Sequence, residues 1–234
     1  MQDNVSSASA GTPLTRNLLR CGIAAGPLYV IVGLAQVATR EGFDVRRHAL
    51  SLLSNGDLGW IQILNFVASG FLVIAGAIGL RKVLRGSRGG TWAPLLLVGY
   101  GVGLIGAGVF VADPGLGFPP GASPESTDMS RSGLLHFVFG GFGFYALIGA
   151  SFVFSRRFKS LKETPWSVYS LITGLGFLVS FAAIASGSKS PAVILAFYAA
   201  VLWVWAWHSA VCLKVMRDVP GLAPEVQRSR AQAG

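Results

Sequence analysis

The residues best suited to chemistry lie in one polar stretch, residues 43–55, between two long apolar segments. Its polar members recur at i, i+4, i+7 and i+11, a spacing that puts them within roughly 60° of one another on a helix. They are Asp44, His48, Ser51 and Asn55. The pattern predicts an amphipathic helix that lies on the membrane surface. The alternative is a solvated loop helix with ordinary polar residues.

Three residues are predicted to carry catalysis, namely His48, Asp113 and His136. Imidazole and carboxylate groups transfer protons in general acid–base catalysis, and Asp44 is placed to orient His48. Two histidines with Asp113 or Asp44 also supply enough ligands for a zinc ion, which can keep a bound water. No diagnostic ligand spacing supports the metal. A turn in Asp-Pro-Gly is the alternative role for Asp113.

The predicted ligand-binding residues surround the same stretch and are Asp44, Arg46, Arg47, Ser51, Gln62 and Asn65. Arginine suits bidentate contact with phosphate, so Arg46 and Arg47 are expected to hold an anionic head group. Gln62 and Asn65 line the floor of a pocket beneath His48 or, alternatively, hydrogen-bond to a neighbouring helix. A serine hydrolase is disfavoured because the chain lacks a G-x-S-x-G elbow.

The composition places the chain in a membrane. Of its 234 residues, 52% are hydrophobic and only 12% are charged, whereas soluble domains carry about 25% charge. The net charge of +9 does not indicate nucleic acid binding, because the basic residues form short clusters between apolar runs. Cys21 and Cys212 lie far apart and are expected to be free thiols. Membrane lipids are the expected partners, and the sequence identifies no protein partner or oligomeric state.

Six apolar segments are long enough to cross about 30 Å of hydrocarbon. They cover residues 21–39, 60–80, 92–112, 134–155, 166–186 and 191–213. The predicted fold is therefore an all-α, polytopic bundle of six transmembrane helices. Most Lys and Arg residues fall on the side of the two termini, so both termini are predicted to be cytoplasmic in a plasma (inner) membrane. The transmembrane domain is expected over 21–215, with disordered tails at 1–20 and 216–234.

Two further expectations concern the packing of these helices. Small residues let membrane helices approach closely, so the third and fourth segments are expected to form a tight pair. The small residues are Gly99, Gly103, Ala107, Gly140 and Gly141. His208 falls towards the cytoplasmic end of the last segment, and we expect an interfacial histidine there.

Two groups of residues resemble a known family. The first runs from Gly42 through Arg47-His48-Ala49-Leu50-Ser51 to Asn65-Phe66, and the second from Gly108 through Asp113-Pro114 to Gly133 and His136. Both resemble the six-helix membrane family catalogued as domain of unknown function 998, over roughly residues 20 to 215. The chain is also distantly similar to membrane proteins of the Frag1 and DRAM kind. The resemblance implies fold and topology, but no established reaction.

Three functions stay open at this point. The leading hypothesis is a polar pocket at the extracytoplasmic face that binds or processes an amphipathic ligand, such as a lipid or isoprenoid phosphate. A small-molecule or ion-coupled transporter is the second, although no span carries an acid or base at its centre. The third is a noncatalytic scaffold or stress regulator, whose outer loops only pack.

Overall fold

The computed structural model describes residues 12–123 and 129–219, and its regular structure is helical. Six long helices follow one another: α2 (Pro13–Thr39), α3 (Gly59–Leu84), α4 (Trp92–Val109), α5 (Arg131–Ser160), α6 (Thr164–Ala185) and α7 (Pro191–Asp218). A short 3₁₀ helix, η1 (Leu50–Ser54), lies between α2 and α3. The described residues form no β-strand. All six helices are long and apolar enough to span a membrane, which confirms the predicted fold class.

Two helices extend beyond the predicted transmembrane domain, residues 21–215. α2 begins at Pro13, where proline costs no hydrogen bond, and the Thr12 side chain caps it. Leu19 is fully buried, so the first turns of α2 pack within the bundle. α7 likewise continues to Asp218. The rest of the predicted tails lies outside the described residues, at 1–11 and 220–234.

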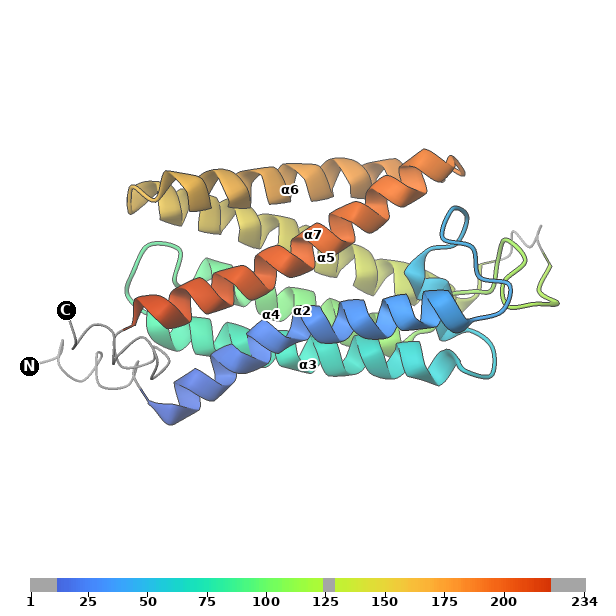
Figure 1. The fold of residues 1–234 in the computed structure, drawn as a ribbon, viewed down its shortest axis with the longest axis horizontal. Coiled ribbons are helices and arrows are strands. Elements are labelled where there is room, and N and C mark those ends of the chain that lie inside the picture. Colours follow the sequence, from blue (N-terminus) through green and yellow to red (C-terminus); the bar gives the residue numbers. More distant parts are fainter. Residues whose placement is uncertain (1–11, 124–128, 220–234) are drawn as a thin grey trace, which may run out of the picture.

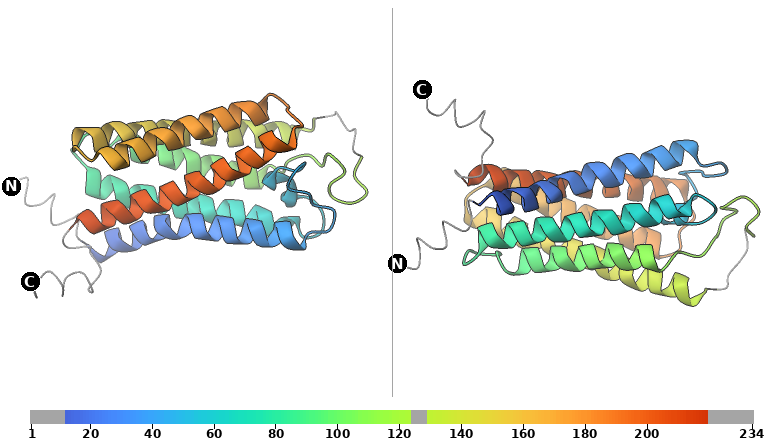
Figure 2. Two further views of the ribbon diagram at one scale, coloured as in Figure 1. Left: turned by 45° about the horizontal axis from the view of Figure 1, so that its top comes forward. Right: turned by 90° about the horizontal axis from the view of Figure 1, so that it is seen from below.

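The helices form a closed ring in which each packs against its neighbours in the sequence (Figure 1). The ring closes because α7 runs back against α2, as the further views in Figure 2 show. The start of α2 and the end of α7 lie at the same end of the bundle. The opposite end carries the segments 40–58 and 110–123 and is called the loop end below.

The contact between α2 and α7 depends on a proline within α2. Pro27 has no N–H, so the carbonyl of Ile23 loses its helical donor. The hydroxyl of Ser209 on α7 donates to this carbonyl at 2.9 Å. Gly26 makes the approach feasible, because a Cβ there would lie 2.5 Å from the Ser209 hydroxyl oxygen. A helix-breaking residue thus supplies the acceptor that joins the first and last helices.

The predicted tight pair is α4 and α5, and it depends on only some of the predicted small residues. A Cβ on Gly103 would lie 2.6 Å from the Cα of Gly143, so these two backbones touch. At Gly140, by contrast, an added Cβ would meet no atom within 4 Å. Gly140 therefore borders open space instead of a neighbouring helix.

The side chain of His208 points into the bundle. Its side chain is 1% exposed and lies within the bundle, next to Trp205. The Nε2 atom is 4.0 Å from the Sγ of Cys212, one turn further along α7. The position along the helix was predicted, but the direction of the side chain depends on the packing of α7 against its neighbours.

Candidate functional site

The segment after α2 forms a tight turn instead of the predicted surface helix. The backbone N–H of Asp44 donates to Nδ1 of His48 at 2.9 Å, and the N–H of His48 donates to the Asp44 carbonyl at 2.9 Å, which closes a single turn. Ala49 then adopts an extended conformation, with φ −71° and ψ 150°, and the helical path stops before η1. The continuous polar helix over 43–55 does not form, and the polar residues are divided between the turn and η1.

His48 connects the two loops at the loop end. Its Nε2 lies 3.2 Å from the carbonyl oxygen of Leu116. A carbonyl only accepts, so Nε2 carries the proton and Nδ1 is the acceptor, as Asp44 requires. The ring is 2% exposed and packs between Phe43 and Phe118, with centroids 5.3 and 5.6 Å away. Both ring nitrogens are therefore engaged in holding the loops together.

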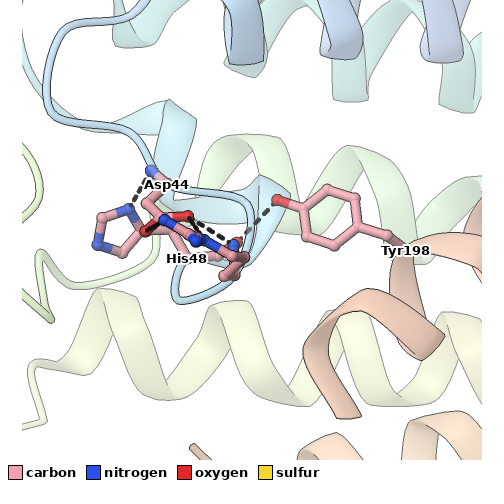
Figure 3. A network of polar contacts seen from close by, with 4 residues as sticks. Asp44, His48 and Tyr198 are labelled. Atoms are coloured by element: carbon pink, nitrogen blue, oxygen red, sulfur yellow. Dashed lines mark hydrogen bonds and ion pairs between the residues drawn. The ribbon is translucent and has the colours of Figure 1, made fainter. Parts of the chain in front are cut away.

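The backbone of His48 makes a third connection. Its carbonyl accepts a 2.7 Å hydrogen bond from the hydroxyl of Tyr198 on α7 (Figure 3). On the other loop, Leu116 has φ 56°, a conformation that costs a non-glycine residue about 1–3 kcal/mol. The hydrogen bonds that its carbonyl accepts from His48 and Arg47 help to offset this cost.

Arg40 is a structural residue of this site that the sequence reasoning missed. Its guanidinium donates to the carbonyl oxygens of Leu53, at 3.1 Å, and of Asn55, which fastens η1 to the end of α2. It also lies over the Phe118 ring, 5.3 Å from the centroid. Partial burial lowers the pKa of Arg40, and the charge of Asp57 opposes that shift. Its signal in the sequence is a lone arginine directly after the first apolar segment.

The two arginines predicted to hold an anionic head group lie on the surface of the turn. Arg46 pairs with Asp44, at 3.2 Å between Nε and Oδ1, and its side chain is 69% exposed. The backbone N–H of Arg46 holds the pKa of the Asp44 carboxyl below its ordinary range, and the guanidinium adds to the effect. Arg47 is also exposed and makes a long hydrogen bond of 3.4 Å to Leu116.

Asp113 organises the start of α5. Its carboxylate accepts hydrogen bonds from the backbone N–H of Ser130, at 2.8 Å, and from the Ser130 hydroxyl. Ser130 in turn caps α5 by accepting from the N–H of Gly133 at 3.0 Å. A Cβ on Gly133 would overlap the carboxylate, so a glycine is needed there. The carboxylate thus lies against the cap of α5.

Gln62 and Asn65 connect α3 to α2. The Oε1 atom of Gln62 accepts from Gln36 at 2.8 Å and from Asn65 at 3.3 Å. Asn65 also donates to the backbone carbonyl of Tyr29 at 3.2 Å. All these side chains are buried. This geometry matches the interhelical hydrogen bonding that was one of the two predicted roles.

His136 caps the end of α4. Its Nδ1 lies 2.9 Å from the carbonyl oxygens of both Ala107 and Phe110. Carbonyls in the last turn of a helix lack intrahelical donors, so one N–H that serves two of them stabilises the helix end. The side chain is 6% exposed.

A cavity of about 470 Å³ occupies the loop-end half of the bundle. η1 and the residue before it cover it, through Ala49, Leu50 and Ser51. Aromatic side chains dominate the wall: Tyr29, Phe66, Tyr100, Phe144, Phe177, Phe181, Phe197, Tyr198 and Trp205. Trp205 stacks on Tyr29, with centroids 4.7 Å apart, towards the middle of the bundle. Of the predicted site residues, only Ser51 and His136 line this cavity.

The structure does not assemble the predicted zinc ligands. Within residues 12–123 and 129–219, no three His, Cys, Asp or Glu side chains are grouped closely enough to hold a metal ion. His48, Asp113 and His136 each bind a different set of backbone or hydroxyl groups. Their predicted catalytic roles stay predictions.

Six spanning helices joined by short turns and two longer loops define an integral, multi-pass membrane protein. Residues 23–214, which reach from α2 to α7, match the family described as protein of unknown function (DUF998), and the chain belongs to that family. The family predicted from the two motif groups is confirmed. No curated protein and no solved structure matches the chain. The distant similarity to Frag1 and DRAM proteins stays a prediction.

Proposed function

We propose that this protein binds the apolar part of a membrane lipid in the cavity beneath η1. The observation that carries the proposal is the cavity itself, whose volume of about 470 Å³ lies within the range of about 300–1,000 Å³ typical of small-molecule sites. Membrane helices pack closely when nothing separates them. An aromatic-lined space of this size within the ring supports a bound molecule.

The wall of the cavity suggests the route by which a lipid enters. Phe137 on α5 is 63% exposed, and Ala185 and Gly187 near the end of α6 are also exposed. All three line the cavity. The lining thus reaches the surface between the loop-end parts of α5 and α6, where a lipid chain moves in sideways from the bilayer.

Binding is better supported than catalysis by the same contacts. Both ring nitrogens of His48 and both carboxylate oxygens of Asp113 hold the loops and the cap of α5. Neither residue lines the cavity. The polar loops therefore act as a rigid cover, and the apolar chamber below them holds the ligand.

The proposal can be tested with a substitution that fills part of the cavity. Gly140 lies one turn from both His136 and Phe144, on the helix face that lines the cavity, and a Cβ there meets open space. Gly140→Leu should therefore occupy the chamber. Gly176→Leu is the matched control, because Gly176 on α6 also borders open space but does not line the cavity.

The readout is native mass spectrometry of gently purified protein, with any retained lipid released and weighed. We expect the parent and Gly176→Leu to retain a lipid mass and Gly140→Leu to lose it. A parent without retained lipid, or two variants that retain it equally, would overturn the proposal.

A further inference from the structure

One ring nitrogen in the cavity wall is fixed as a hydrogen-bond acceptor. The carbonyls of Ala107 and Phe110 can only accept, so Nδ1 of His136 carries the proton that both of them share. In the neutral imidazole the other nitrogen, Nε2, then has a lone pair and no proton. The cap of α4 thus sets the tautomer of His136.

This Nε2 atom has no hydrogen-bond partner among the described residues. The ring of His136 lies beside Phe66 and Phe137, with both centroids 6.1 Å away. Nε2 is not among the fully buried side-chain atoms, and His136 lines the cavity. A donor in the cavity can therefore reach Nε2, and a ligand that displaces water from it has to supply that donor itself.

We infer that the cavity selects a neutral lipid with a hydroxyl group, which donates to Nε2 of His136. The inference rests on the proposed function, since it names the class of lipid that the same cavity holds. The bilayer and the cavity are similarly apolar surroundings for a lipid chain. Burial of the chain therefore hardly distinguishes one lipid from another. The polar contact decides which lipid is retained.

The other polar groups of the wall agree with this choice. The hydroxyls of Tyr29 and Tyr100 can donate or accept, so they accommodate a ligand oxygen without requiring a donor from it. No Arg or Lys from the described part of the chain lines the cavity. A carboxylate or phosphate would bring no proton to Nε2 and would meet no cation there.

The test compares hexadecanol with pentadecyl methyl ether, an isomer of the same chain length that lacks the hydroxyl donor. Binding to the purified protein is measured by native mass spectrometry, with palmitate as an anionic third probe. The alcohol should bind the parent roughly two- to tenfold more tightly than the ether, the range expected for one hydrogen bond. Palmitate should bind no better than the ether.

Two variants test the roles of the two ring nitrogens of His136 separately. His136→Asn puts an amide N–H near the place of Nδ1 and keeps the cap of α4, but leaves nothing at the place of Nε2. His136→Gln reaches the place of Nε2 with an amide that can accept. We expect the preference for the alcohol to vanish in His136→Asn and to persist, at least in part, in His136→Gln.

Each outcome answers one of the two proposals. If alcohol and ether bind equally to the parent, the cavity binds lipids but the role of His136 is overturned. Tighter binding of palmitate also overturns that role. If no probe binds the parent, the proposed function itself fails. The comparison of probes on the parent decides the question even if a variant does not fold.

Discussion

The hydroxyl of Tyr198 donates a 2.7 Å hydrogen bond to the backbone carbonyl of His48, a residue 150 positions away in the chain. The bond joins α7 to the segment that covers the cavity. Tyr198 itself lines that cavity. The ring of His48 contacts Leu116 in the loop between α4 and α5. The cover is therefore attached to the helix ring at a defined point.

Replacing Tyr198 by Phe should loosen this cover. The buried carbonyl of His48 would lose its donor, which costs about 1–3 kcal/mol. We expect faster hydrogen exchange of the amides of residues 49–54 and unchanged exchange in the middle of α3. The control is Tyr145→Phe, because Tyr145 is 63% exposed. Equal exchange in the two variants would show that the bond does not hold the cover.

Asp113 and Gly133 should be energetically coupled. Gly133→Ala places a methyl group against the Asp113 carboxylate and should destabilise the protein by about 1–3 kcal/mol. In an Asp113→Ala background the clash is absent, so the same change should cost at least about 1 kcal/mol less. Unfolding free energies in mixed micelles measure this coupling. Strictly additive effects would argue against the contact.

The cytoplasmic location of the termini is a prediction that single cysteines can test. Asp57 at the loop end and Arg85 after α3 are both exposed, and they lie at opposite ends of the bundle. In a cysteine-free background, Asp57→Cys should react with a membrane-impermeant maleimide in intact cells. Arg85→Cys should react only after the membrane is opened. The reverse pattern would invert the topology and would contradict the positive-inside reasoning.

The six spans were predictable because an apolar run of about 20 residues is a local property of the chain. The family was predictable for a similar reason, since its motif residues can be read directly. The turn at Asp44 was not, because the backbone leaves the helical path at Ala49, and the Nδ1 atom of His48 binds the Asp44 N–H within the single turn before it. The periodicity of polar residues does not indicate where the backbone leaves a helical path.

The roles of the polar residues were harder to predict than their positions. His48 and His136 were selected from the sequence as candidate site residues, and their side chains contact loop-end segments of the bundle. Their partners, however, are carbonyl groups such as those of Leu116 and Ala107. Every residue has a carbonyl, so no residue type in the sequence indicates where such a partner lies.

The cavity was beyond sequence reasoning for a geometric reason. Gly103 and Gly140 are the same residue type in the sequence. Gly103 touches a neighbouring backbone, whereas Gly140 borders empty space. The difference depends on which part of α5 meets another helix, since Phe139 and Gly143 contact α4 whereas Gly140 borders the cavity. Which part faces the cavity depends on the packing of the whole ring.

The closure of α7 against α2 has a consequence for synthesis. The first helix enters the membrane with Pro27 and the unpaired carbonyl of Ile23, and its partner Ser209 follows 186 residues later. The cavity is incomplete until then, because α7 supplies Tyr198 and Trp205 to its wall. Whatever the cavity holds can be enclosed only once α7 has joined α2.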